Sequence, residues 1–280
     1  MARRSRRQDG AQVMSLLNWG KGLFCGLAVA IGLAGAMQPA AAEALDDVLA
    51  AGVIRIAVPQ DFPPFGSAGP DLQPQGYDID MANLIAQDLG VKVELVPVTS
   101  ANRLPYLQTR KVDLIISSLG RNAEREKVID FTSAYAPFFS GVFGPADSTV
   151  AKAEDLSGKT VGVTRGALED LAISKIAPAD ADIERFEDNN TTIAAFLSGQ
   201  TELIATGNVV AAAILARDPS VRPEPKFILS QSPCFIGLNK GEPKLLAKVN
   251  AIIAAAKQDG RLNAISKKWL GAALPGDLPV

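Results

Sequence analysis

The chain has 280 residues, a formal net charge of −2, two cysteines and no histidine. Without histidine, imidazole acid–base catalysis, a Ser-His-Asp triad and His-ligated zinc are excluded. We expect no metal and no cofactor. The length is sufficient for one large domain or for two lobes of ordinary size.

The first 42 residues have the order that is typical of a cleavable signal peptide. An apolar run from Gly22 to Met37 leads to small residues that end at Ala42. The basic residues before it are Arg3, Arg4, Arg6, Arg7 and Lys21. The run covers about 16 residues, whereas a membrane-spanning helix needs roughly 20. We therefore expect Sec-dependent export to the periplasm and cleavage after Ala42, with Met1 or Met14 as the true start.

Removal of residues 1–42 makes the chain more acidic. The remainder contains 23 Lys and Arg against 29 Asp and Glu, a net charge of −6. This charge disfavours nucleic acid as a partner. Cys25 leaves with the signal peptide, so Cys234 stands alone and no intrachain disulfide is expected.

Short strands and amphipathic helices alternate along the rest of the chain. The expected strands are 53–58, 91–96, 113–117, 160–164, 202–206 and 234–238. The expected helices are 79–89, 102–109, one from 166 onward, 191–197, and two C-terminal segments around 245–253 and 262–269. This alternation predicts an α/β fold with mostly parallel sheets that are flanked by helices.

The composition indicates one internal boundary. A stretch rich in Gly, Ala, Asp and Ser follows Phe139 and precedes a new strand at Thr160. We assign 43–139 to lobe 1, 140–232 to lobe 2 and 233–280 to a return into lobe 1. Ligands bind at the carboxyl ends of strands in such folds, so the site is expected in a cleft between the lobes.

One strand end has the features of a carboxylate receptor. Ser117, Ser118 and Gly120 end a buried strand, and Arg125 follows after a short loop. Hydroxyl groups, free backbone N–H groups and a guanidinium suit a carboxylate, because arginine binds it in bidentate fashion. The alternative is a capped helix start with Arg125 in a salt bridge on the surface.

Two further loops are candidate ligand contacts. The turn at Arg165, before Ala167 and Leu168, leads into a helix whose first N–H groups suit an anion, although an ordinary strand-to-helix turn needs the same Gly166. After the first strand, Asp61 and Phe62 begin a loop stiffened by two prolines. Its aromatic residues either contact a ligand or seal the edge of the core.

Taken in order, these segments resemble the periplasmic solute-binding proteins of polar amino-acid ABC transporters, the bacterial extracellular family 3. The resemblance extends from about Gly52 to Leu270. It rests on the segments 54–58, 62–65, 76–80, 111–113, Ser117-Ser118, Glu124-Arg125, Phe131-Thr132, 156–159, 161–163 and Asp259-Gly260.

The resemblance implies a Venus-flytrap fold of two lobes joined by two hinge strands and closing on an amino acid. Arg125 looks like the clamp for the α-carboxylate, assisted by Ser118 and the N–H of Gly120, with Ala167 and Leu168 facing the ligand. Phe62 resembles the aromatic residue that stacks on the ligand. The segment Thr99-Ser100-Ala101-Asn102-Arg103 is similar to the one that presents an arginine to the side-chain carboxylate in acidic amino-acid receptors.

The chain departs from the family pattern at three places. Gly120 replaces a usual Ser or Thr, and Ala167-Leu168 replaces a usual pair of hydroxyl residues. The strand end that normally supplies an aspartate for the ligand's ammonium reads Ala205-Thr206-Gly207-Asn208. The ammonium would then be bound by Asn208, Asp61, Glu187 or Asp188, or by no residue at all.

The resemblance implies a monomeric, non-enzymatic transport receptor. It would bind a polar amino acid, acidic ones included, or a related small carboxylate, and deliver it to an ABC permease in the inner membrane. One alternative is a periplasmic enzyme like cyclohexadienyl dehydratase, with Glu169, Asp170 or Glu187 as general acid. Another is a ligand-binding module of a sensor.

Overall fold

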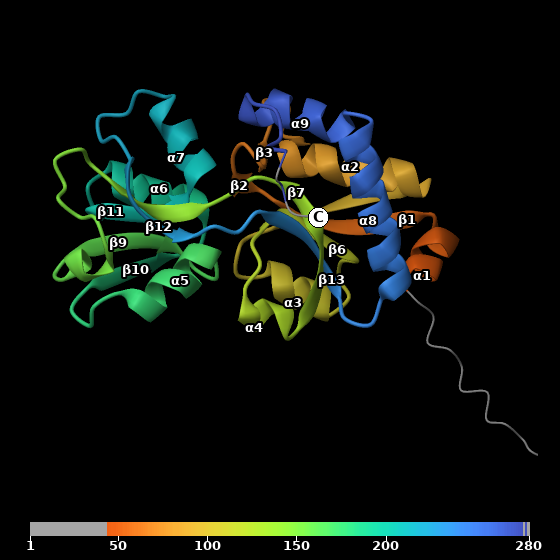
Figure 1. The fold of residues 1–280 in the computed structure, drawn as a ribbon, viewed down its shortest axis with the longest axis horizontal. Coiled ribbons are helices and arrows are strands. Elements are labelled where there is room, and N and C mark those ends of the chain that lie inside the picture. The colour runs from red at the N-terminus through yellow and green to blue at the C-terminus, as the bar shows by residue number, and fades with distance from the viewer. Residues whose placement is uncertain (1–43, 277, 279–280) are drawn as a thin grey trace, which may run out of the picture. The chain divides into compact units, whose positions relative to one another are not determined.

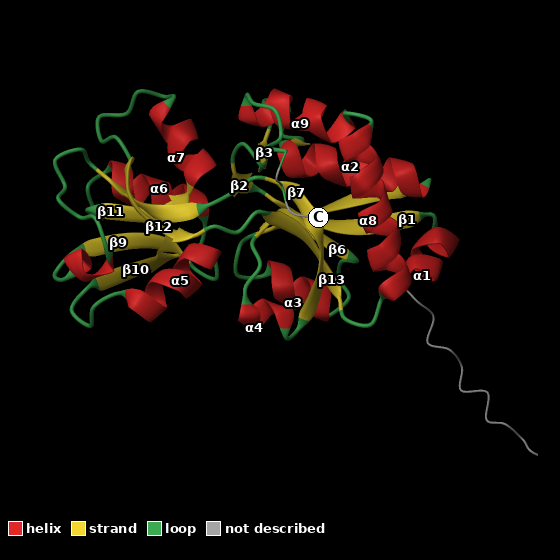
Figure 2. Cartoon of the chain, in the orientation of Figure 1, coloured by secondary structure: helices red, strands yellow, loops and turns green. Residues whose placement is uncertain are grey.

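The computed structural model describes residues 44–276 and residue 278, and the predicted signal peptide lies outside the described residues. In this part of the chain, no helix has both the length and the apolar character that crossing a membrane requires. Two five-stranded sheets carry helices on their faces (Figures 1 and 2). We call the part around the first sheet lobe 1 and the part around the second sheet lobe 2.

Four of the five strands of the lobe 1 sheet run in the same direction. The spatial order is β5 (Lys92–Val98), β1 (Val53–Pro59), β6 (Leu114–Leu119), β13 (Cys234–Asn239) and β7 (Ile129–Ala136). β13 is antiparallel to both of its neighbours. The carboxyl ends of β1, β5 and β6 therefore share one edge of the sheet, where ligands bind in α/β folds.

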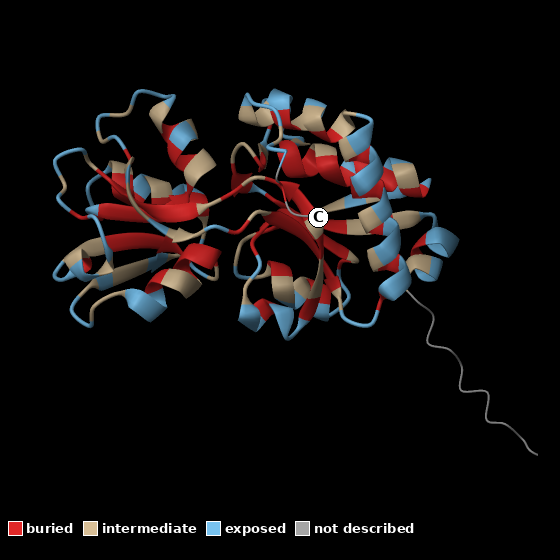
Figure 3. Cartoon of the chain, viewed as in Figure 1, coloured by how far each residue is buried: buried red, intermediate tan, exposed pale blue. Residues whose placement is uncertain are grey.

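Helices cover both faces of the lobe 1 sheet because β1 is apolar on both sides. Ile54 and Ile56 are fully buried in a cluster with α2 (Tyr77–Leu89), α8 (Pro243–Gln258) and α9 (Arg261–Leu270), and α1 (Ala44–Ala51) lies at its margin. Ala57 packs in a second cluster with Leu107 of α3 (Arg103–Gln108). The short α4 (Ala123–Glu126) precedes β7. Buried residues consequently concentrate in the strands (Figure 3).

The lobe 2 sheet has the same direction pattern, with a single antiparallel strand, β8, inserted before its last strand. The order is β10 (Asp182–Phe186), β9 (Thr160–Thr164), β11 (Leu203–Gly207), β8 (Ser140–Gly144) and β12 (Glu224–Ser230). α5 (Leu168–Ile176) packs on one face through Ile173. α6 (Asn189–Leu197) and α7 (Asn208–Leu215) pack on the other through Phe196 and Ala211, and the 3-10 helix η1 (Ala153–Leu156) precedes β9.

A small three-stranded sheet follows β1 and was not predicted. It consists of β2 (Asp61–Phe62), β3 (Gly66–Ala68) and β4 (Pro74–Gln75). Its short strands hold Asp61 and Phe62 directly beyond the end of β1. The ring of Phe62 stacks on Phe65 at 6.1 Å, and Phe65 is fully buried. The Pro-rich loop therefore helps to close the core and also presents residues at the strand edge.

The predicted fold class is confirmed, and each predicted strand and helix is present with slightly shifted ends. Besides the three strands of the small sheet, β7, β8, β10 and β12 were not predicted. β10 and β12 are partly exposed and polar, so they lack the apolar signature of buried parallel strands. The chain passes between the two sheets at 137–139 and at 231–233.

Gly76 provides a test of the packing around the small sheet. Its φ is 142°, and an added Cβ would collide with the backbone carbonyl of Phe65. Gly76→Ala is expected to lower the free energy of unfolding by about 3 kcal/mol or more, because conformational strain and a backbone clash add. Urea denaturation measures it.

Gly90 is the matched control, since it has a φ of 73° with no atom near the position of a Cβ. Gly90→Ala should cost only about 1–2 kcal/mol. Equal losses in the two variants would contradict the proposed clash.

Candidate functional site

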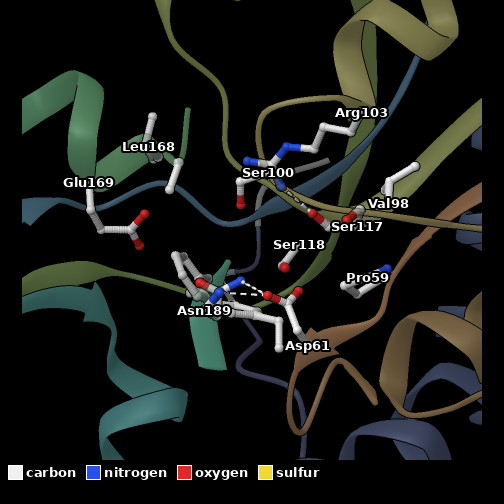
Figure 4. Close-up of a pocket in the computed structure, with 13 residues that line it drawn as sticks. Pro59, Asp61, Val98, Ser100, Arg103, Ser117, Ser118, Leu168, Glu169 and Asn189 are labelled. Carbon is white, nitrogen blue, oxygen red and sulfur yellow. Dashed lines mark hydrogen bonds between the residues drawn. The ribbon is translucent and has the colours of Figure 1, made fainter. Parts of the chain in front are cut away.

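A polar pocket lies at the carboxyl edge of the lobe 1 strands and is completed by lobe 2 (Figure 4). The lining residues are Pro59, Asp61, Phe62, Val98, Ser100, Arg103, Ser117, Ser118, Phe138, Ala167, Leu168, Glu169 and Asn189. The first nine belong to lobe 1 and to the segment that leaves it, and the last four come from α5, α6 and the residue before α5.

A buried carboxylate holds the end of β6 in place. Ser118 has a φ of 39°, a backbone conformation that residues other than glycine rarely adopt. Its N–H donates to Oδ2 of Asp78 at 2.7 Å, and Oδ1 of the same carboxylate accepts from the hydroxyl of Tyr135 at 2.6 Å. Asp78 belongs to the first turn of α2 and is fully buried. The helix thus fixes the strained strand end that borders the pocket.

Two guanidinium groups are buried at this side of the site. Arg103, which begins α3, donates to the carbonyl of Ser117, and its Nε has no hydrogen-bond partner. Arg125 donates from Nη1 to the carbonyl of Gly120 at 2.7 Å and from Nη2 to Gly166 at 3.1 Å. Among the described residues, neither guanidinium forms an ion pair. Burial, together with the charge of Arg103, lowers the pKa of Arg125 to about 9.

Leu168 explains one departure from the family pattern. A Cβ added to Gly120 would lie 2.5 Å from Cδ2 of Leu168. The leucine side chain thus occupies the space that a Ser or Thr at position 120 would need. The two departures at positions 120 and 168 are therefore complementary, because the apolar side chain from lobe 2 packs against a glycine of lobe 1.

Two carboxyl groups line the pocket. Oδ2 of Asp61 accepts from the backbone N–H of Asn189 and from its Nδ2 at 3.2 Å. Glu169, in the first turn of α5, is 5% exposed, and its Oε1 has no hydrogen-bond partner. Burial raises the pKa of both groups, while the Asn189 bonds partly offset this effect at Asp61 and the positive charges of Arg103 and Arg125 partly offset it at Glu169.

Most of the predicted site residues line this pocket. They are Asp61, Phe62, Ser100, Arg103, Ser117, Ser118, Ala167 and Leu168. Phe62 has both of the roles that the sequence left open, because it faces the pocket and also packs on Phe65 and Phe138. The alternative interpretation of this loop was a capped helix start with Arg125 at the surface. Asn122 does cap α4, but Arg125 is buried, with 3% of its surface exposed.

Four predicted site residues do not line the pocket. The carbonyl of Gly120 is bound by Arg125, and Leu168 covers the glycine. Arg125 does not line the pocket either, and its guanidinium donates to the carbonyls of Gly120 and Gly166 beside it. Arg165 points away and pairs with Glu187 at the surface. Oδ1 of Asn208 accepts a hydrogen bond from the N–H of Phe139, so this side chain binds the segment that connects the lobes.

Five lining residues were not assigned to a binding site from the sequence. Pro59, Val98 and Phe138 are apolar and gave no chemical signal, and Asn189 is one of many polar residues before a helix. Glu169 was considered only as an acid for the enzymatic alternative. Asp78 was quoted in a motif without a role, although an acid between apolar residues of a buried helix face is a recognisable signal.

The Asp78 contact predicts a dependence of stability on pH. Burial raises the pKa of Asp78 from 3.8 to about 7, against opposing contributions from Tyr135, Ser118 and Arg103. The stabilising contribution of this group is therefore complete below about pH 4 and is lost as the pH rises through 7. Asp78→Asn has the same shape without the charge. We expect the stability of the native chain, relative to Asp78→Asn, to fall by about 4 kcal/mol between pH 4 and 8.

Urea unfolding of both proteins across this pH range measures the difference. Asp61 and Glu169 are common to both proteins, so their titration cancels. A difference that stays constant with pH would show that Asp78 is ionised throughout the range.

Comparisons with known proteins agree with this geometry. The L-cystine-binding protein TcyJ of Escherichia coli (strain K12) is 27% identical over 232 residues, which cover 81% of this chain and 86% of the relative. A structure of the solute receptors for L-cysteine of Neisseria gonorrhoeae has a TM-score of 0.76 and 31% identity, and covers 81% and 93%. The ancestral amino acid-binding protein AncCDT-1, described as a precursor of cyclohexadienyl dehydratase, has a TM-score of 0.73 and 31% identity, and covers 81% and 99%.

A family model extends over most of the described residues. It matches residues 54–272, which include both sheets and every residue that lines the pocket. The predicted family is therefore confirmed: this chain belongs to the bacterial extracellular solute-binding proteins, family 3.

Proposed function

We propose that this protein is the periplasmic substrate-binding component of an ABC transporter for a polar amino acid or a related small carboxylate. The carrying observation is the pair of buried guanidinium groups, Arg103 and Arg125, which form no ion pair among the described residues. A buried charge without a counter-ion is costly, and a bound carboxylate would offset that cost.

The proposal assigns a role to the surroundings of these cations. Ser118 and the N-terminal residues of α5 contribute hydroxyl and N–H donors beside the pocket. Phe62 and Phe138 form an apolar wall for the non-polar part of the ligand. A ligand held by residues of both lobes would favour the arrangement in which the lobes are together, and the permease would recognise this form.

The remaining parts of the proposal concern the whole protein. Residues 1–42 direct export and are removed, and the mature protein acts as a monomer in the periplasm. Residues 43–139 and 233–280 form one moving body and 140–232 the other, with the two crossing segments as hinges. The relatives that bind cystine and cysteine support a small amino acid as the ligand.

A thermal-shift screen tests the function. The protein is unfolded and refolded to remove any co-purified ligand, and is then heated with each of the twenty L-amino acids, L-cystine and a set of small organic acids. At a concentration 100 times Kd, a ligand stabilises the fold by about 2.7 kcal/mol, enough to raise Tm by several degrees. Failure of every compound to raise Tm would contradict the proposed function.

Arg125→Ala is expected to weaken binding of the best compound at least 100-fold. The substitution removes a buried positive charge beside the pocket, which would attract the ligand's carboxylate. Isothermal titration calorimetry measures the loss, and circular dichroism establishes that the variant is folded. Arg222→Ala is the matched control, because this arginine lies at the surface in a pair with Asp218. Unchanged affinity in Arg125→Ala would show that Arg125 does not take part in ligand binding.

A second candidate function is that of a dehydratase acting on cyclohexadienyl acids. One observation favours it: burial raises the pKa of Glu169, which favours the protonated form that a general acid needs. AncCDT-1, described as a precursor of such an enzyme, is among the structural neighbours. Incubation with prephenate or arogenate tests this function through the absorbance of an aromatic product. If the native protein forms product and Glu169→Gln does not, the protein is an enzyme. If the native protein forms no product, the dehydratase function is excluded.

A further inference from the structure

The chain has no carboxylate where β11 ends, so the ammonium of an amino-acid ligand needs another partner. Gly207 and Asn208 occupy this position. The ring of Phe138 lies directly against Gly207, and Oδ1 of Asn208 accepts a hydrogen bond from Phe139. This strand end therefore offers the pocket an aromatic wall in place of a charge.

Two acids of the neighbouring loop are used elsewhere. Glu187 is exposed and pairs with Arg165. Asp188 caps α6, where Oδ1 accepts from the N–H and the hydroxyl of Thr191. Neither residue lines the pocket. The acids that do line it are Asp61 and Glu169.

The two pocket acids differ in how their oxygens are used. Asp61 accepts two hydrogen bonds from Asn189, which join lobe 1 to the start of α6. Glu169 has a buried oxygen, Oε1, that accepts none. Its carboxyl group points into the pocket, toward the space in front of Ser118 (Figure 4). A buried acceptor without a donor is costly, and a ligand N–H group would satisfy it.

We propose that Oε1 of Glu169 accepts a hydrogen bond from the ligand's ammonium group, and that the site therefore selects α-amino acids without net charge. This inference rests on the proposed function, because it assumes that a small carboxylate occupies the pocket. It adds the residue that distinguishes an amino acid from a simple carboxylic acid.

The position of Glu169 suits the geometry of an α-amino acid. Glu169 and Arg103 line the same pocket, so an acidic and a basic side chain border one ligand space (Figure 4). The receptor for a cation thus lies beside the receptor for an anion. In an α-amino acid the ammonium and the carboxylate are attached to the same carbon, so such a ligand presents both charges to groups of one pocket. Burial raises the pKa of Glu169, and the positive charges of Arg103 and Arg125 oppose this effect and favour the ionised form.

The acids of the pocket limit how much negative charge a ligand can bring. Arg103 and Arg125 carry two positive charges, and Asp61 and Glu169 carry two negative charges when ionised. A zwitterion adds no net charge, whereas the second carboxylate of an acidic amino acid would be buried beside Asp61 or Glu169 and would be repelled. Glutamate and aspartate are therefore expected to bind less tightly than their amides, in contrast to the preference that the resemblance around Arg103 implied.

The experiment compares an amino acid with the same molecule lacking the ammonium. The probe is the L-amino acid that raises Tm most in the thermal-shift screen, paired with its L-2-hydroxy acid, and Kd is measured by calorimetry. Glu169→Gln should weaken the amino acid roughly 10- to 100-fold and leave the 2-hydroxy acid within about threefold, because only the ammonium loses a charged acceptor. Glu187→Gln is the matched control on the same lobe and should change neither value.

Equal effects of Glu169→Gln on both probes, or an effect on neither, would overturn the proposal. If only Asp61→Asn abolishes the preference for the amino acid over its 2-hydroxy acid, Asp61 binds the ammonium, and the proposal is wrong. The native protein gives a test that does not depend on any variant: glutamine should bind at least tenfold more tightly than glutamate, and the reverse order would be fatal to the inference. If neither amino acids nor small organic acids bind, the proposed function itself fails; if they bind but Glu169→Gln leaves the discrimination intact, only this inference fails.

Discussion

The buried positive charge of Arg103 and Arg125 is the constraint on which the site depends. Both side chains are less than 5% exposed, and within the described part of the chain their hydrogen bonds go to backbone carbonyls rather than to carboxylates. Carbonyl dipoles compensate a full charge only in part, so the pocket retains an affinity for anions. The pocket does not bind every anion equally well, because Glu169 places a negative charge beside the two cations.

The fold supplies this arrangement through strand ends and helix starts. Parallel order places the ends of β1, β5 and β6 at one edge, so Pro59, Val98 and Ser117 meet although they are distant in sequence. Asp78 then holds Ser118 in its unusual backbone conformation from the helix behind the sheet. The same helix carries the apolar residues that cover the sheet, so the packing of the core and the shape of the pocket are linked.

The sequence allowed the fold and most of the site to be predicted because both follow from short patterns. Short apolar runs and alternation identified six strands of the two large sheets, whereas β10 and β12 are half exposed and lack that signal. β7 and β8 are mostly buried and were missed as well. Asp61, Arg103 and Ser118 lie where a strand ends or a helix begins, and such positions are visible in a sequence. The roles of Glu169 and Asp78 could not be predicted. That of Glu169 depends on a carboxyl oxygen that lacks a hydrogen-bond donor, and that of Asp78 depends on its contact with the end of β6. Likewise, the match of Gly120 with Leu168 joins two lobes and has no local signature.

A crystal structure of the protein with its best amino acid bound would test the central claim most directly. We expect the ligand's carboxylate to lie within hydrogen-bond distance of a guanidinium nitrogen of Arg103 or Arg125, at about 2.7–3.1 Å. We also expect its ammonium to contact Oε1 of Glu169. A ligand whose carboxylate faces away from both arginines, or one that binds outside this pocket, would contradict the account.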